Sequence, residues 1–311
     1  MLELNVNRRT RLRFLNRDFI SNWQLYLIFL PVLIYYLVFS YVPMAGILIS
    51  FQRFNVRAGI FGSEWIGLEN FKTFFDSYYF ERVIGNTIKL SLADLIFAWP
   101  TSIVFALLLN EISKDWFKRP IQTLTYLPHF ISVVVITGII VDFTNTNGVI
   151  NDILHFFGQE RLSLLINPSY FTPIYVISNI WQGMGYGSII YIAAIAAINP
   201  ELYEAATIDG AGKIRQAYHI TLTGIAPTII TLLILRIGNI LNIGFEKILL
   251  LQNNSNVGAS EIISTFVYKK GIIEAVYGYS TAINLFNSLI CLTLLFAANW
   301  LSRKFTESSL W

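Results

Sequence analysis

Few residues in this sequence are arranged so that they could carry out catalysis. An ATP site needs a Gly-x-x-x-x-Gly-Lys-Ser/Thr loop whose backbone cradles the phosphates. The one Gly-Lys pair, Gly212-Lys213, has Thr207 in place of the first glycine and Ile214 in place of the Ser or Thr. The three histidines lack metal-ligand spacing; they are His129, His155 and His219. The sequence therefore predicts no catalytic or metal site, and ATP energy would have to come from another polypeptide.

The segment 199–223 is polar and helix-prone, and it lies between two long apolar runs. Asn199 is a good N-cap, and Pro200 suits the first helical position because its missing N–H would be unpaired there anyway. Glu201 and Glu204 follow in the first turn, where the helix dipole favours negative charge. We expect a short helix to begin here.

The same segment contains a second helical stretch at 213–220 and two glycines that can take left-handed geometry between the helices, Gly210 and Gly212. Ala205 and Ala206 leave one side of the first helix almost bare, so another surface could approach its backbone closely. On local physics alone, a solvated loop with good helix caps explains the pattern equally well.

The composition places the chain in a membrane. Mean hydropathy is +0.57, 55% of residues are hydrophobic and only 13% are charged, whereas soluble domains have about 25% charged residues. Six apolar stretches each approach the ~20 residues that cross a bilayer core. We place these spans at 25–50, 85–109, 122–143, 171–197, 224–250 and 279–301.

The distribution of positive charge predicts the orientation. The inner segments would be 1–23, 110–121, 198–223 and 302–311, with twelve Lys and Arg against seven in the outer segments 51–84, 144–170 and 251–278. This excess favours an inside N-terminus. We therefore divide the chain into a basic cytoplasmic segment (1–23), a transmembrane domain (24–301) and a cytoplasmic tail (302–311), with 199–223 on the inner side. The arginines in 1–23 suit a membrane anchor better than a nucleic-acid site.

Polar residues within the spans are expensive in hydrocarbon, so they usually face a cavity or a partner. Amides that both donate and accept, and aromatics that can stack on a sugar ring, would suit a carbohydrate path. Hydrogen bonds between helices are the competing explanation. The candidates are Asn179, Trp181, Gln182, Tyr186, Arg236, Asn239, Asn242, Glu246, Asn284 and Asn287. Those from Arg236 to Glu246 would share one face of a continuous helix.

Several other residues have structural interpretations. Lys89 and Asp94 are five apart, so we predict no ion pair between them, and Asp142 marks the outer end of the third span. We expect Lys247 to extend toward the outer interface. The glycines at 183, 185 and 187 would allow close packing or bending. The lone cysteine, Cys291, cannot form an internal disulfide.

The loop resembles the EAA loop of ABC importer permeases. The resemblance lies in Glu204-Ala205-Ala206, Gly210 after three residues, and Ile220-Thr221-Leu222 after nine more. The family pattern continues with Pro, where this chain has Thr223. The resemblance implies coupling helices that sit in a groove of an ATPase subunit, with contacts from Glu204, Ala205, Ala206, Asp209, Gly210, Ile220 and Leu222.

The first outer segment extends the resemblance. Residues 51–84 mix aromatics and turn formers, as in Trp65 to Phe71, and follow Pro31 and Tyr41-Val42-Pro43. They resemble the N-terminal region of sugar-importer permeases of the branch associated with polysaccharide-derived oligosaccharides, whose outer loops meet a binding protein. An aromatic belt at the lipid headgroups is the alternative.

The resemblance implies an all-α membrane protein with the type I ABC importer permease fold in a bacterial cell membrane. It would work by alternating access with a second permease, two ATPase subunits, an extracellular or periplasmic binding protein and a carbohydrate, with no nucleic-acid partner. ATP and Mg²⁺ would be used by the ATPase subunits, and this chain would bind no cofactor. Contact with the second permease is then a third explanation for the polar residues in the spans.

Two other classes of function remain open. An ion-driven secondary transporter would need a buried carboxylate for ion coupling, for which Asp94 is the central candidate. A membrane scaffold would have no transport activity with any partner.

Overall fold

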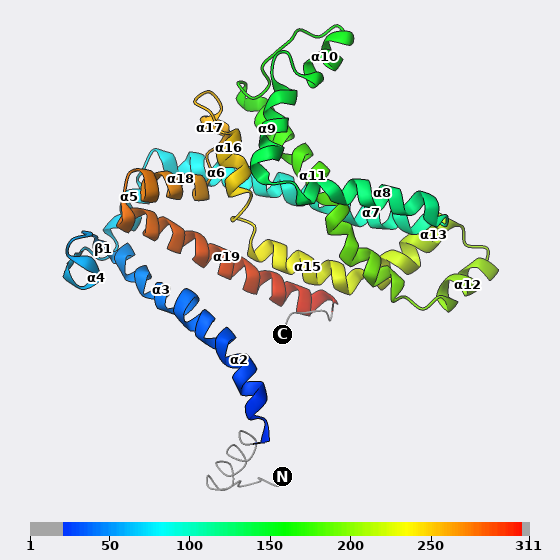
Figure 1. Ribbon diagram of the computed structural model, residues 1–311, viewed down its shortest axis with the longest axis horizontal. Coiled ribbons are helices and arrows are strands. Elements are labelled where there is room, and N and C mark those ends of the chain that lie inside the picture. Colours follow the sequence, from blue (N-terminus) through cyan, green and yellow to red (C-terminus); the bar gives the residue numbers. More distant parts are fainter. Residues whose placement is uncertain (1–20, 307–311) are drawn as a thin grey trace.

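The computed structural model describes residues 21–306, and the arginines at positions 8–17 lie outside this part. The described chain is an elongated bundle of helices (Figure 1). Four helices are long and apolar enough to cross a membrane, and counting two bent helix pairs gives up to six. The six-span prediction is therefore confirmed in outline, although two of the spans are interrupted.

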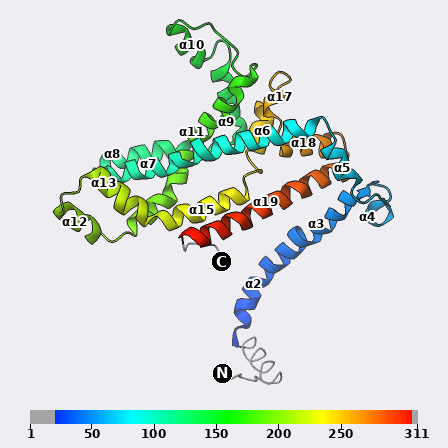
Figure 2. The same cartoon turned by 180° about the vertical axis from the view of Figure 1, so that it is seen from behind.

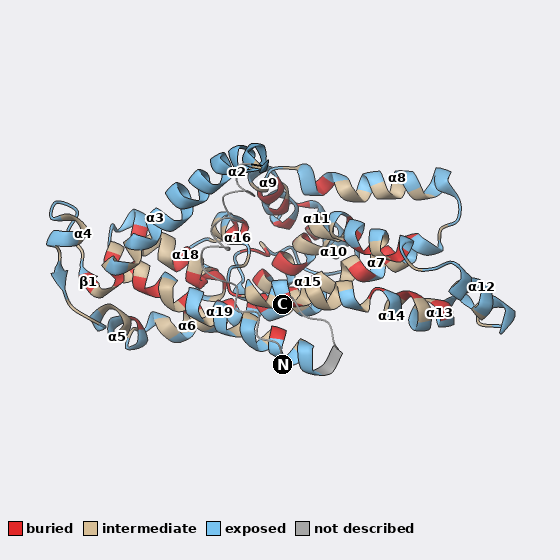
Figure 3. Ribbon diagram, turned by 90° about the horizontal axis from the view of Figure 1, so that it is seen from below, coloured by how far each residue is buried: buried red, intermediate tan, exposed pale blue. Residues whose placement is uncertain are grey.

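The first span runs from Trp23 to Phe51 and stands apart from the bundle (Figures 1 and 2). It consists of α2 (Trp23–Tyr36), the π-helical η1 (Leu37–Tyr41), α3 (Val42–Met44) and the 3₁₀ segment η2 (Ala45–Phe51). None of the residues of α2 is buried, whereas η2 packs against the last helix. In Figure 3 α2 and α3 are pale blue along their length.

The second span is longer than predicted, at Tyr79–Glu111. It joins α6 (Tyr79–Ala93) to α7 (Trp99–Glu111) through a π-helical turn, η3 (Asp94–Ala98). Such turns widen a helix locally and often occur at functional sites. This turn begins at Asp94, near the middle of the span.

The third span differs from the prediction because its helix is broken. α8 (Asp115–Tyr126) passes into the 3₁₀ turn η4 (Leu127–Phe130), and α9 (Val133–Thr144) starts again in a new direction (Figure 1). Ser132 caps α9 by accepting from the backbone N–H of Val135 at 3.4 Å. The helix ends two residues after Asp142, in agreement with the prediction for that residue.

The fourth span is the continuous helix α11 (Pro168–Ala196). It begins as a capped helix should, because the Asn167 side chain accepts from the backbone N–H of Ser169 at 3.0 Å and Pro168 follows the cap. It is the central element of the bundle, with extensive contacts to α7, α8 and η3.

The glycines of α11 permit these contacts. A Cβ on Gly185 would lie 2.3 Å from the carbonyl oxygen of Thr125 on α8, and one on Gly187 would lie 2.6 Å from Oγ of Ser102 on α7. Gly183 has open space around it. The close-packing interpretation therefore holds for two of the three glycines.

The fifth span is interrupted and the sixth is continuous. α15 (Ala226–Gly238) ends well before α16 (Phe245–Leu251), and residues 239–244 between them are not helical. Gly244 has a positive φ of 41°, and a Cβ there would lie 2.3 Å from Oη of Tyr175 on α11. α19 (Tyr277–Thr306) packs along α15.

The predicted outer segments are folded. They contain β1 (Gln52–Arg53), α4 (Gly59–Gly62), β2 (Glu64–Trp65), α5 (Glu69–Phe75), α10 (Val149–Phe156), α17 (Val257–Ser260), α18 (Ile263–Tyr268) and the π-turn η6 (Lys269–Ile273). The two strands pair antiparallel, with Gln52 opposite Trp65. The Trp65 ring stacks on Phe51 at 5.7 Å. A buried Glu261 joins α6 to this region through Arg82 and through Lys269 at 3.0 Å.

The positions of the connections agree with the predicted alternation. The predicted outer elements lie along the left and upper edges of Figure 1, whereas α12 (Glu201–Ile208) lies at the right edge and α2 begins at the lower edge; α19 runs from the left edge toward the centre. Buried residues concentrate where α6, α7, α9, α11, α15 and α16 meet. The largest fully buried side chains there include Leu90, Ile136, Phe171 and Tyr175.

Candidate functional site: a two-helix loop and an intramembrane charge network

The inner loop forms the two short helices that its sequence indicated. Its first helix is α12, and the second begins at α13 (Lys213–Gln216) and continues through the π-helical η5 (Ala217–Thr221) into α14 (Leu222–Gly224). The Asn199 side chain accepts from the backbone N–H of Glu201 at 3.1 Å, but α12 begins at Glu201 with Pro200 at the N-cap position, one residue later than predicted. The second helix thus runs past Thr223, and the chain bends by 59° before α15.

The turn between the helices uses one left-handed glycine rather than two. Gly210 has a φ of +76°, whereas Gly212 has φ −71° and ψ 167° and takes the extended geometry of an N-cap. The prediction for Gly212 was wrong, because one left-handed residue already reverses the chain. Gln216 closes the turn by donating to Oγ1 of Thr207 at 2.9 Å and to the carbonyl of Ala211 at 3.0 Å.

Two further contacts hold the loop in place, the first between its two helices and the second from the loop to the bundle. Oη of Tyr203 lies 3.0 Å from Oγ1 of the buried Thr221, and Nζ of Lys213 lies 3.5 Å from the Glu111 carboxylate at the end of α7. Leu222 packs against the core cluster at the inner end of the bundle. The loop is therefore a preformed unit whose base is anchored in the bundle.

The predicted loop residues divide between the tip and the base. Glu204, Ala205, Asp209 and Gly210 are exposed, whereas Ile220 and Leu222 are half-buried. Large apolar side chains that the sequence reading passed over are also exposed around the tip: Leu202, Ile208, Ile214 and Tyr218. Their presence in an otherwise polar loop was the available signal for a protein-contacting surface.

Within the bundle, charged side chains from two spans and an amide from a third form one connected network. The Asp94 carboxylate, at the π-turn of span two, forms an ion pair with Arg236 on α15 and accepts from the Asn179 amide on α11 at 2.8 Å. The Asn179 carbonyl oxygen accepts from Nζ of Lys247 on α16 at 2.7 Å. Asp94 is 2% exposed and Lys247 5%, whereas the Arg236 side chain is 45% exposed.

This network corrects two predictions. Lys247 does not extend to the interface, because the break at 239–244 turns α16 so that its ammonium faces α11 and Asn179. The same break separates Asn239 and Asn242 from Glu246, so these residues do not share a helical face with Arg236. Asp94, which was assigned a structural role without a partner, is the anion at the centre of the network.

The other predicted path residues form smaller groups. Asn287 donates to Asn242 at 2.7 Å, which joins span six to the break in span five. The Tyr186 ring stacks on His129 at 3.7 Å, nearly parallel. Among the described residues, no side-chain hydrogen bond joins the remaining candidates to these groups; they are Trp181, Gln182, Asn239, Glu246 and Asn284.

Residues 98–307 match the family described as binding-protein-dependent transport system inner membrane component. The chain belongs to this family. It is a multi-pass inner membrane permease, and proteins of this family are not themselves enzymes.

Individual relatives match over nearly the whole chain. Protein LplB of Bacillus subtilis (strain 168) is 44% identical and the match covers 92% of this chain and 90% of LplB. The polygalacturonan/rhamnogalacturonan transport system permease protein YteP of the same organism is also 44% identical, with the same shares covered. A crystal structure of a bacterial ABC transporter involved in import of the acidic polysaccharide alginate contains a chain 41% identical, with a TM-score of 0.88 over 94% of this chain and 99% of that one. The ABC importer permease fold is thereby confirmed.

Proposed function

We propose that this chain forms, with a second permease, the translocation path of an ATP-driven importer for a carbohydrate, specifically an oligosaccharide. The observation that carries the proposal is the preformed inner loop with its exposed tip. The names of relatives support the substrate class, since YteP is named for polygalacturonan and rhamnogalacturonan and the structural relative imports alginate. A binding protein as partner is supported by the complex of that relative with a pentasaccharide-bound periplasmic protein.

In the proposed mechanism, an ATPase subunit grips the tip of the loop. Glu204 makes a charge contact, Ala205 and Ala206 allow close approach, and Asp209 and Gly210 shape the turn. Ile220 and Leu222 would transmit force, because the base of the loop packs against α7, α11 and α15. Closure of the ATPase dimer on ATP and Mg²⁺ would then move α13 to α15 and rock the spans toward the outward-open state.

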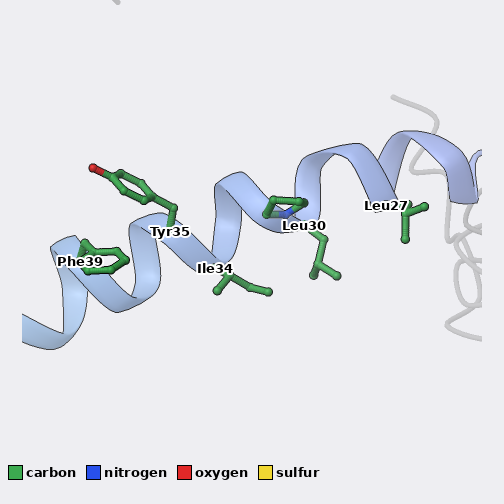
Figure 4. Close-up of a pocket in the computed structure, with 6 residues that line it drawn as sticks. Leu27, Leu30, Ile34, Tyr35 and Phe39 are labelled. Carbon is green, nitrogen blue, oxygen red and sulfur yellow. The ribbon is translucent and has the colours of Figure 1, made fainter.

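The exposed first span supports a second permease as partner. The side chains of α2 and η1 that line a shallow apolar depression are drawn in Figure 4: Leu27, Leu30, Pro31, Ile34, Tyr35 and Phe39. A helix with no buried residue in its own subunit has its whole surface available for lipid and for another subunit. The proposed heterodimer would cover part of this surface.

Reconstitution tests the proposal. The chain would be placed in liposomes alone, and in a complex with its candidate second permease, ATPase and binding protein, and oligosaccharides would be screened for uptake and stimulated ATP hydrolysis. We expect both activities only in the complete complex. Uptake by the chain alone would indicate a secondary transporter, and no uptake with any partner would indicate a scaffold.

A further inference from the structure

The intramembrane network carries more positive than negative charge. Arg236 and Lys247 contribute two cations, and Asp94 contributes the one anion that they share. The neighbouring Glu246 is exposed and has no hydrogen bond to the network within the described residues. A surplus charge at membrane depth is expensive unless something supplies its counter-charge.

The surplus charge is located on Arg236. Lys247 is buried and linked to Asp94 through the Asn179 amide, so it offsets part of the carboxylate's charge. The Arg236 guanidinium has five N–H donors. Its Nη2 nitrogen pairs with Asp94, and nearly half of the Arg236 side chain is exposed. The guanidinium therefore has donors and net charge available for a further anion.

The surrounding backbone is also unusual. The network lies between the π-turn that begins at Asp94 and the non-helical residues 239–244. Discontinuous helices near the middle of a membrane commonly form the substrate sites of transporters. Lipid is a poor environment for the exposed guanidinium, which leaves the path or the partner subunit as its surroundings.

We propose that Arg236 binds a carboxylate of the transported sugar, so that the substrate is an acidic, uronic-acid-containing oligosaccharide. Lys247 is the positioning residue: because it offsets part of the negative charge of Asp94, the positive charge of Arg236 is not fully neutralised within this chain. This inference rests on the proposed function. The geometry of a guanidinium suits a carboxylate, which it can bind with two parallel hydrogen bonds. A single surplus charge matches a carboxylate better than a phosphate group, which carries about −1.5 to −2.

The first experiment compares substrates on the complete transporter complex. Oligogalacturonates of defined length would be compared with the same oligosaccharides after reduction of their carboxyl groups to alcohols, by uptake and by ATP hydrolysis at saturating binding protein. We expect uptake of the acidic forms. Uptake of the reduced forms alone would overturn the inference and leave the proposed function intact, whereas uptake of neither by the complete complex would count against the proposed function itself.

The second experiment removes the surplus charge. Lys247→Met leaves Asp94 and Arg236 as a neutral pair, and Lys247→Gln does the same while keeping a donor for Asn179. The readout is the amount of oligogalacturonate moved per ATP hydrolysed, because a folding defect would lower both quantities together. We expect this ratio to fall about tenfold in both variants, on the scale of one lost charge interaction.

Lys89→Met is the matched control. Lys89 is also a cation in a predicted span, but its side chain is exposed and makes no hydrogen bond or ion pair with the network in the described chain. Its loss should leave the ratio unchanged. An unchanged ratio in the Lys247 variants, or an equal fall in Lys89→Met, would overturn the proposal. If the second permease is lost on purification of the Lys247 variants, the anion that pairs with Arg236 belongs to that subunit. This result would also overturn the proposal.

Discussion

Asp94 is the residue on which the intramembrane network depends. Its carboxylate is the shared anion of two cations of the fifth span: it pairs directly with Arg236 and is linked to Lys247 through the Asn179 amide. Asp94→Asn would leave both cations without their counter-charge, and breaking a buried pair in this way costs about 3–5 kcal/mol. We expect a clearly lower thermal unfolding midpoint for the detergent-solubilised complex.

A double variant separates charge from packing. Adding Arg236→Gln to Asp94→Asn removes one stranded cation, so part of the lost stability should return. Glu246→Gln is the control, because this exposed carboxylate makes no hydrogen bond or ion pair with the network in the described chain. If the double variant is no more stable than Asp94→Asn alone, charge compensation does not explain the effect.

As the charge network depends on Asp94, the turn in the loop at 199–223 depends on Gly210. Its φ of +76° strains any residue with a Cβ, and strain of this kind costs about 1–2 kcal/mol. Because no atom lies within 4 Å of the position, Gly210→Val should distort the turn without a steric clash in the bundle. We expect normal membrane levels with loss of coupled uptake.

The control for Gly210→Val is Gly158→Val. Gly158 also has a positive φ, +82°, and open space, but it lies in a predicted outer segment. Uptake should survive this change. Wild-type uptake by Gly210→Val would count heavily against a coupling role for the turn.

At the scale of the helix, the glycines of α11 give a matched pair. A Cβ at Gly185 would meet the backbone of α8 at 2.3 Å, and backbone cannot move aside cheaply. Gly183 lies two residues earlier in the same helix with open space. We expect Gly185→Ala to lower the unfolding midpoint of the complex and Gly183→Ala to leave it unchanged; equal effects would contradict the packing in this region.

The elements also indicate how much could be read from the sequence. Length and hydropathy were enough to place continuous spans, such as α11 and α19, because a run of about twenty apolar residues indicates a transmembrane helix. The turn at Gly210 follows from local chemistry and was predicted, whereas α12 begins one residue later than the predicted cap at Asn199 implies. The break at 239–244 was not predicted, although it contains Asn239, Asn242 and Gly244. These residue types are also found within membrane helices, and it is the tertiary contacts with Tyr175 and Asn287 that accompany the break here.

The charge network shows the same limit. Asp94, Asn179, Arg236 and Lys247 come from four elements, and no spacing along the chain reveals that they meet. The sequence could show only that each is costly in a membrane. This was sufficient to select Asn179 and Arg236 as candidates, but their partners could be assigned only once the helices were in place.

For the whole molecule, the position of α2 makes a prediction about assembly. Leu30→Ala with Ile34→Ala removes apolar volume from a helix that has no buried residue, so the thermal stability of the isolated subunit should not change. Less second permease should co-purify with the variant. Ile136→Ala is the control, since this residue is 0% exposed in the core and its truncation should cost about 2–5 kcal/mol of stability.

That detached helix also bears on how a cell keeps its subunits in balance. In a copy synthesised in excess, this long apolar helix would pack against no other described part of its own subunit. Cellular proteases degrade proteins that expose such surfaces. We expect copies that have not assembled with the second permease to be degraded. The ratio of the two permeases in the membrane would then be set by degradation of unassembled copies rather than by the rates at which the two are synthesised.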